Sequence, residues 1–142
     1  MKIVICGSIE FTKEIKKAED TLKARGYMVE IPTTSNLIIK EKLTVAEYRN
    51  DSVRESAARK IKDDVIRDYY QKIKKADAIL VVNVKKKGIN GYIGGNTFLE
   101  MGFAHVLNKK IYLYNSVPRM SYIDEILAMK PIVINGDLLK IK

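Results

Sequence analysis

Short apolar runs alternate along this chain with longer stretches in which apolar residues recur at helical spacing. The apolar runs predict β-strands at residues 2–6, 27–31, 76–84, 110–114 and 132–134. The helical spacing predicts helices over residues 11–25, 44–75, 96–107 and 121–129. Residues 33–43 show neither pattern, and we expect irregular structure there.

The alternation of strands and helices predicts the fold class. Strands that are separated by helices form a parallel sheet with helices on both faces, which is a three-layer α/β/α arrangement. Ligands of such sheets bind outside the carboxyl ends of the strands. The loops at residues 7–12, 84–97 and 115–121 follow predicted strands, so we expect them to meet at one site.

Length and composition narrow the class of protein. The chain has 142 residues, of which 46% are apolar, and this predicts a single domain over residues 1–142. One cysteine excludes an internal disulfide and a cysteine-rich zinc site, and one histidine excludes a multi-histidine metal site within the chain. We expect no metal and no cofactor. The N-terminal MKIVICGS is typical of a first strand and not of a signal peptide, so we expect a soluble, cytoplasmic protein.

The charge balance favours an anionic partner without identifying it. The 26 basic and 17 acidic residues give a net charge of +9, which attracts phosphates or nucleic acid. A lysine-rich, solvated surface explains the same excess more simply. No nucleic-acid-binding motif accompanies it, so we do not expect nucleic acid as the partner.

The strongest candidate site is GGNTFLEMG at residues 94–102. Gly94 and Gly95 allow close approach of a ligand, and a helix that begins near Asn96 would present free N–H groups to an anion. The helix dipole would keep Glu100 ionised if that residue lay in the first turn, and an ionised carboxylate is a nucleophile or base. The competing interpretation is a capping box made by Thr97 and Glu100, which needs no ligand.

Other polar residues carry weaker signals. Gly7 and Ser8 follow the first strand and offer N–H groups and a hydroxyl to a ligand, but they are not part of a dinucleotide fingerprint. We interpret the remaining candidates as structural or solvent-exposed: Asp63, Asp64 and Asp68 as solvated ion pairs, Asp77 as a strand boundary, His105 as a core or surface residue and Cys6 as a buried apolar group.

Four stretches together resemble the nucleoside 2-deoxyribosyltransferase-like superfamily, which includes the 2'-deoxynucleoside 5'-monophosphate N-hydrolases. They are ICGSI at residues 5–9, KKADAILVVNV at 74–84, GGNTFLEMGFAHVLNKKIYLY at 94–114 and PRMSY at 118–122. Their order and spacing cover nearly the whole chain. The third stretch fits the family pattern of a glycine loop followed by E-[LMI]-G-x-A, a basic turn and a strand.

The resemblance implies a flavodoxin-like five-stranded sheet and a homodimer or higher homo-oligomer with shared sites. It implies cleavage of the N-glycosidic bond of a nucleoside or its 5'-monophosphate, with Glu100 as nucleophile. Residues 94–96 would hold the sugar or the 5'-phosphate. Gly7, Ser8 and Ile9 would line the base and sugar pocket, and Ser121 would reach the phosphate in a neighbouring subunit's site.

The chain departs from the family pattern at one position. The family usually has an aspartate eight residues before the aspartate of the central strand, and counting back from Asp77 gives Tyr69. Asp68 is its neighbour and is the candidate general acid. The hydrolase is favoured over the base-exchanging transferase.

Two alternatives remain open besides the transferase. Tyr69 at the acid position favours a nucleotide-binding module without turnover. The loop GGNTFLE is also similar to the GGxGTxxE loop of the cytokinin-activating phosphoribohydrolases, although it is one residue shorter. Those enzymes cleave ribosyl rather than deoxyribosyl monophosphates.

Overall fold

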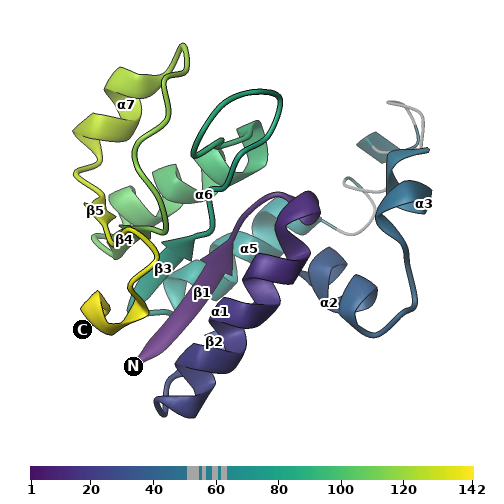
Figure 1. Cartoon of the computed structure of the whole chain (residues 1–142), viewed down its shortest axis with the longest axis horizontal. Helices are drawn as coiled ribbons and strands as arrows, with labels where there is room; N and C mark the ends of the chain where they lie inside the picture. The colour runs from purple at the N-terminus through teal and green to yellow at the C-terminus, as the bar shows by residue number, and fades with distance from the viewer. Residues whose placement is uncertain (51–54, 56, 59–60, 62–63) are drawn as a thin grey trace.

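The computed structural model describes residues 1–50, 55, 57–58, 61 and 64–142. At its centre is a five-stranded sheet with the order β2-β1-β3-β4-β5, in which every neighbouring pair is parallel. The strands are β1 (Lys2–Cys6), β2 (Met28–Glu30), β3 (Ala78–Val81), β4 (Lys110–Leu113) and β5 (Ile132–Val133). This is the flavodoxin-like topology, and it confirms the predicted α/β fold (Figure 1).

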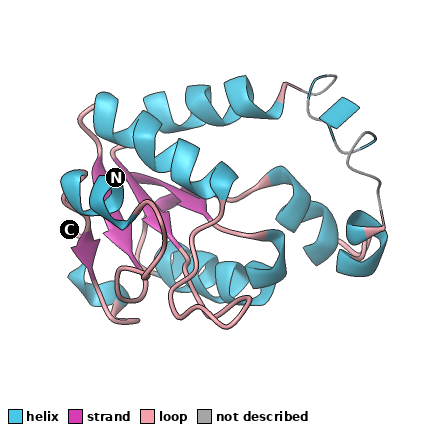
Figure 2. Cartoon of the chain, turned by 90° about the horizontal axis from the view of Figure 1, so that it is seen from above, coloured by secondary structure: helices cyan, strands magenta, loops and turns pink. Residues whose placement is uncertain are grey.

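Helices lie on both sides of the sheet (Figure 2). The α-helices are α1 (Thr12–Ala24), α2 (Thr33–Ile39), α3 (Val45–Arg49), α5 (Val65–Lys74), α6 (Gly95–Val106) and α7 (Ile123–Ala128). Two short 3-10 helices, η1 (Ile9–Phe11) and η2 (Leu138–Lys140), precede α1 and follow β5. The predicted helices over 11–25, 96–107 and 121–129 therefore correspond to α1, α6 and α7.

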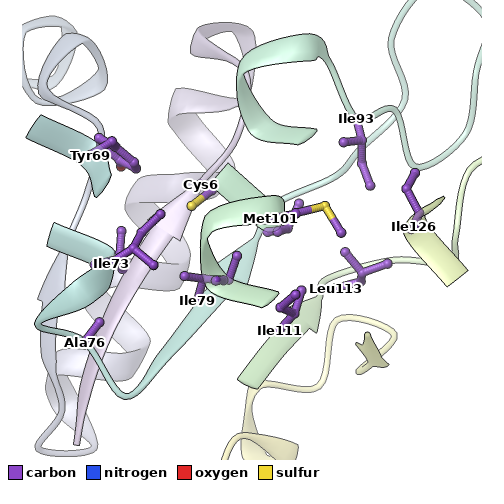
Figure 3. Close-up of a cluster of buried hydrophobic side chains, with 13 residues drawn as sticks. Cys6, Tyr69, Ile73, Ala76, Ile79, Ile93, Met101, Ile111, Leu113 and Ile126 are labelled. Atoms are coloured by element: carbon purple, nitrogen blue, oxygen red, sulfur yellow. The ribbon is translucent and has the colours of Figure 1, made fainter. Parts of the chain in front are cut away.

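Alternating side chains of each strand build two hydrophobic cores. On β1, Ile3 and Ile5 pack on the face covered by α1, whereas Val4 and Cys6 pack on the face covered by α5, α6 and α7. Figure 3 shows the second core, in which Cys6 of β1 lies in the same buried cluster as Tyr69 of α5 and Met101 of α6. The last residue of β1 thus points toward the helix that carries Glu100.

The structure corrects two predictions for the region after β2. Residues 33–43 are not irregular throughout, because α2 forms directly after Pro32 and buries Ser35, whose hydroxyl accepts a hydrogen bond from Thr12 at 3.1 Å. The prediction of one helix over 44–75 is also wrong. The helix α3 ends at Arg49, and α5 begins only after Asp64, which has a φ of 43° that interrupts a right-handed helix. The parts of the predicted helix at residues 51–54, 56, 59–60 and 62–63 lie outside the described residues.

Candidate functional site

A buried asparagine fixes the loops at the carboxyl edge of the sheet. Asn83, two residues after β3, is fully buried. Its side-chain amide donates hydrogen bonds to the carbonyls of Gly91 at 3.2 Å and Ser116 at 3.0 Å, and its side-chain oxygen accepts one from the Asn115 backbone at 2.9 Å. These bonds join the loop after β3 to the loop after β4. An asparagine at the end of an apolar strand was the available sequence signal for Asn83, and the motifs that predict the site do not include it.

Helix α6 begins earlier than the sequence predicts. Its N-cap is Gly94, which has extended backbone geometry and makes no side-chain capping bond, and the Phe98 N–H closes the first turn onto the Gly94 carbonyl at 2.9 Å. The capping-box interpretation is therefore wrong. Thr97 is buried inside the first turn, and Glu100 lies in the second turn, beyond the reach at which the helix dipole acts most strongly.

Glu100 faces α5 across a small pocket between α5 and α6. The other lining residues are Val65, Ile66, Tyr69, Asn96, Leu99 and Phe103. The cavity volume is about 40 Å³, which admits water but not a nucleoside. A larger ligand would have to displace side chains that line the pocket, of which Ile66 and Leu99 are 49% and 41% exposed.

The surroundings of Glu100 favour the protonated form of its carboxyl. Burial raises the pKa of its carboxyl from 4.5 to about 8, against the opposing effects of a hydrogen bond from the Cys6 thiol and the positive charge of Lys72. The condition under which the helix dipole would keep Glu100 ionised, a place in the first turn, is not met. In the second turn the helix dipole lowers the pKa of Glu100 only weakly, whereas burial against α5 and β1 raises that pKa by more.

Two buried side chains share the surroundings of Glu100. Burial raises the pKa of the Cys6 thiol, and the neighbouring Glu100 carboxyl raises it further. The Tyr69 hydroxyl donates a hydrogen bond to the Ile5 carbonyl at 2.7 Å, and burial also raises its pKa. The structure thus brings Cys6, Tyr69 and Glu100 together where β1, α5 and α6 meet. Figure 3 shows Cys6 and Tyr69 of this group.

Asp68 lies on the exposed side of α5 and does not line the Glu100 pocket. Its side chain is 53% exposed, and its carboxylate pairs with Lys72 at 3.1 Å. Tyr69, one residue later, takes the buried side of the helix and lines the Glu100 pocket. The interpretation of Asp68 as a member of a solvated ion pair agrees with this contact, whereas its role as general acid stays a prediction.

The remaining predicted ligand-binding residues lie at the carboxyl edge, in separate positions. Gly7 is packed so closely that a Cβ there would lie 3.0 Å from the Val82 carbonyl. Ser8 caps η1, in which Ile9 is the first residue, and its hydroxyl accepts a hydrogen bond from the Lys86 ammonium at 3.0 Å. Asn96 is exposed and lines the Glu100 pocket, and Gly95 has open space around its Cα. Ser121 is exposed in the turn before α7.

The structural interpretations of Asp77 and Cys6 hold. Asp77 lies at the opposite, amino edge of the sheet, where its carboxylate accepts a hydrogen bond from the Lys2 N–H at 2.6 Å. Cys6 is a buried free thiol, and His105 is exposed. In the ranges that the structure describes, no helix has the length and apolar composition that a membrane crossing requires. The described residues also contain no group of three or more His, Cys, Asp or Glu side chains that could hold a metal ion.

Known proteins match this chain in structure and not in sequence. No protein-family model matches it, and neither does any curated protein. A 2-deoxyribosyltransferase from the psychrotolerant bacterium Bacillus psychrosaccharolyticus superposes with a TM-score of 0.53 and 22% identity over 80% of this chain and 71% of its own. The CMP N-glycosidase BcmB from Clostridium botulinum superposes with a TM-score of 0.50 and 17% identity over 95% of this chain and 90% of its own. The predicted likeness to deoxyribosyltransferase-like proteins is thus confirmed for the fold.

Proposed function

We propose that this protein cleaves the N-glycosidic bond of a (deoxy)nucleoside 5'-monophosphate and releases the free base, with Glu100 as nucleophile. The observation that carries the proposal is the position of Glu100. Its carboxyl lies on α6 in a pocket at the carboxyl edge of a parallel sheet, where ligands of such folds bind. The two structural neighbours, a 2-deoxyribosyltransferase and a CMP N-glycosidase, support the reaction class.

The chemistry requires two steps at the anomeric carbon of the sugar. A Glu100 oxygen bonds to this carbon as its bond to the base nitrogen breaks, through a transition state with oxocarbenium character. The base leaves with a proton from an acid. Water then attacks the same carbon, gives one proton back to that acid, releases Glu100 as a carboxylate and yields the sugar phosphate. Because the nucleophile is the carboxylate, Glu100 must first lose the proton that its raised pKa favours at neutral pH.

Lys72 assists that ionisation. Its ammonium lowers the pKa of Glu100 through its charge. It lies 3.1 Å from the Asp68 carboxylate and 5.3 Å from the centre of the Tyr69 ring, which lines the Glu100 pocket. A cation between the solvent-exposed Asp68 and the buried pocket favours a carboxylate at Glu100 over a neutral carboxyl. Lys72 is therefore a positioning residue in this proposal.

The acid that protonates the departing base is proposed to be Asp68. Its carboxylate must leave Lys72 and take up a proton from water before it can act as the acid at the pocket, and loss of the ion pair costs little because surface ion pairs are weak. Asp68→Asn then slows release of ordinary bases more than release of a good leaving group such as 4-nitrophenol from its deoxyriboside. An equal loss for both leaving groups contradicts the acid role.

The remaining site residues follow the family resemblance. Residues 94–96 would hold the sugar or its phosphate, and residues 7–9 would line the base and sugar pocket. Ser121 would serve a neighbouring subunit in a homodimer or larger homo-oligomer. Three exposed apolar side chains that line the pocket between α5 and α6, namely Val65, Ile66 and Leu99, support such an association because a partner would cover them.

The test is base release, followed by chromatography, from a panel of ribo- and deoxynucleosides and their 5'-monophosphates. The matched variants are Glu100→Gln and Glu125→Gln, since Glu125 is an exposed glutamate on α7 that loses the same charge. We expect release by the wild type and by Glu125→Gln, and loss of at least about a thousandfold in Glu100→Gln. Release that persists in Glu100→Gln contradicts the proposal.

Two alternatives are distinguished by the same panel. Release that needs a second free base identifies the base-exchanging transferase. Tight nucleotide binding without release identifies a binding module, and the observation that favours it is Tyr69, whose buried phenol occupies the position where the family has a carboxylate. Comparison of AMP with dAMP separates the ribosyl from the deoxyribosyl substrate.

A further inference from the structure

Two cations converge on one carboxylate oxygen at the carboxyl edge of the sheet. Glu10, in η1, accepts from Arg49 of α3 and from Lys86 of the loop after β3, and both contacts use the same oxygen, Oε1. The Lys86 ammonium lies 3.4 Å from that oxygen and also donates to the Ser8 hydroxyl at 3.0 Å. The side chains of Lys86 and Glu10 are only 19% and 24% exposed. This cluster of Glu10, Arg49 and Lys86 therefore carries a net positive charge, with Lys86 and Glu10 sheltered and Arg49, at 57% exposed, open to solvent.

The loop that carries Lys86 is held in one shape. Lys87 and Gly88 have φ values of 51° and 73°, as in a type I' turn, and Lys86 and Ile89 exchange backbone hydrogen bonds of 3.1 and 2.9 Å across it. The Lys86 ammonium also lies 5.3 Å from the centre of the Tyr92 ring. In Figure 1 this loop stands beside the turn that follows β1, in agreement with the contact between Lys86 and Ser8. The cation is thus presented by a fixed hairpin.

The cluster lies on the same edge as Glu100. Ser8 follows Cys6, whose thiol donates to Glu100, by two residues. The Tyr92 ring that Lys86 contacts packs against the N-cap of α6, where a Cβ on Gly94 would lie 3.3 Å from it. Glu100 is on the second turn of that helix. The cluster is therefore next to the ends of β1 and α6, the two elements that carry Cys6 and Glu100.

We propose that Lys86 and Arg49 form the binding site for the phosphate group of the substrate, and that the Glu10 carboxylate occupies this site in the free protein as an internal counter-ion. The inference rests on the proposed function, because it identifies the 5'-monophosphate, and not the nucleoside, as the substrate class. It leaves the glycine loop at residues 94–96 for the sugar, and it assigns the Ser8 hydroxyl to the phosphate in place of the base and sugar pocket.

The chemistry of the cluster fits a phosphate better than it fits a stabilising ion pair. A phosphate offers three oxygens, so it accepts separately from the Ser8 hydroxyl and from the Lys86 ammonium and the Arg49 guanidinium, which share one oxygen of Glu10 in the free protein. Burial raises the pKa of Glu10, but the hydrogen bond from Arg49 and the charge of Lys86 outweigh it and hold that pKa below its usual value. Glu10 is consequently ionised at neutral pH and competes with an incoming anion.

The test measures binding, so that it does not depend on turnover. The probes are 2-deoxyribose 5-phosphate and 2-deoxyribose, titrated calorimetrically at constant ionic strength into the full chain. The variants are Lys86→Met, Glu10→Gln and the control Lys17→Met, which removes one exposed lysine on α1. We expect the wild type to prefer the phosphorylated sugar. Lys86→Met should weaken its binding about tenfold or more, because it removes a charge-assisted hydrogen bond.

The two key variants act in opposite directions, so a folding defect cannot imitate the expected pattern. Glu10→Gln removes the competitor and should tighten binding of 2-deoxyribose 5-phosphate severalfold, while Lys17→Met leaves it unchanged. The inference is overturned if the wild type does not prefer the phosphorylated sugar. It is also overturned if Lys86→Met weakens binding no more than Lys17→Met, or if Glu10→Gln fails to tighten it.

The same variants separate this inference from the proposed function. If binding follows the expected pattern but no base is released from any nucleotide, the proposed phosphate-binding site is supported and the glycosidase proposal fails. If bases are released equally from nucleosides and monophosphates, and Lys86→Met leaves both rates unchanged, the proposal of N-glycosidic cleavage is supported and the phosphate-binding site is refuted.

Discussion

The buried carboxyl of Glu100 has a consequence for stability that does not depend on any substrate. Its pKa is about 8 in the folded protein, against an ordinary value of 4.5. The folded state therefore binds the Glu100 proton more tightly than the unfolded chain does. Between these two pH values the unfolded chain has lost its proton while the folded chain keeps it, so stability falls as pH rises from 4.5 to 8.

The magnitude follows from the same two pKa values. Each pH unit within this window costs about 1.4 kcal/mol, so raising the pH from about 5 to about 7.5 removes about 3 kcal/mol of stability through this group alone. Glu100→Gln keeps the shape and cannot ionise. Its free energy of unfolding, relative to that of the wild type, should accordingly rise by about 3 kcal/mol across the same pH range.

The assay is urea unfolding followed by circular dichroism at several pH values, with wild type, Glu100→Gln and the exposed control Glu125→Gln. Only the difference between variant and wild type is used, which cancels the titration of groups common to both. We expect a difference that grows with pH for Glu100→Gln and a flat one for Glu125→Gln. A flat difference for Glu100→Gln would mean that its carboxyl titrates as in water, and the argument from burial would be refuted.

Three further predictions concern the ionisation of Glu100, the hydrogen bonds of Asn83 and the packing of two glycines. If Glu100 must be ionised to attack, kcat/KM for release of 4-nitrophenol from its deoxyriboside, a leaving group that needs no acid, should rise tenfold per pH unit below the Glu100 pKa and level off near about 8, whereas a profile that is flat from about pH 6 to 9 contradicts this requirement. Asn83→Ala should lower the free energy of unfolding by about 2–4 kcal/mol because it leaves buried loop carbonyls unpaired, while the exposed Asn90→Ala should cost less than about 0.5 kcal/mol. Gly91→Ala should cost about 2 kcal/mol or more, since its φ is 70° and the new Cβ would lie 2.5 Å from the Ser116 carbonyl. Gly102→Ala, in open space within α6, should stabilise by up to about 1 kcal/mol, and equal melting temperatures for these two glycine variants would count against the packing argument.

The strands were predictable because each is a short apolar run bounded by polar or turn residues. The run at residues 76–84, for example, contains β3, in which all four residues are buried. The helix α2 was not predictable in this way. Its sequence TTSNLII has β-branched and polar residues that disfavour helix, and its position depends on the contact of Ser35 with Thr12, which lies 23 residues away.

The candidate site was predictable in its location and not in its chemistry. The glycine loop and Glu100 were visible as a local motif, and the parallel sheet placed that motif at a ligand-binding edge. The protonation of Glu100 depends on burial by α5 and on Cys6 of β1, which no local spacing reveals. The cluster of Glu10, Arg49 and Lys86 joins residues from three separate segments, so its charges look in the sequence like an ordinary solvated surface.

The central claim is that Glu100 attacks the sugar, and the most direct measurement is capture of the covalent intermediate. The wild type is mixed with the preferred monophosphate from the panel, quenched in acid within milliseconds to seconds, digested and analysed by mass spectrometry. If Glu100 is the nucleophile, a sugar phosphate will be attached to the peptide that contains Glu100, and this adduct will be absent in Glu100→Gln. Base release without this adduct at any time, or an adduct on another residue, would contradict it.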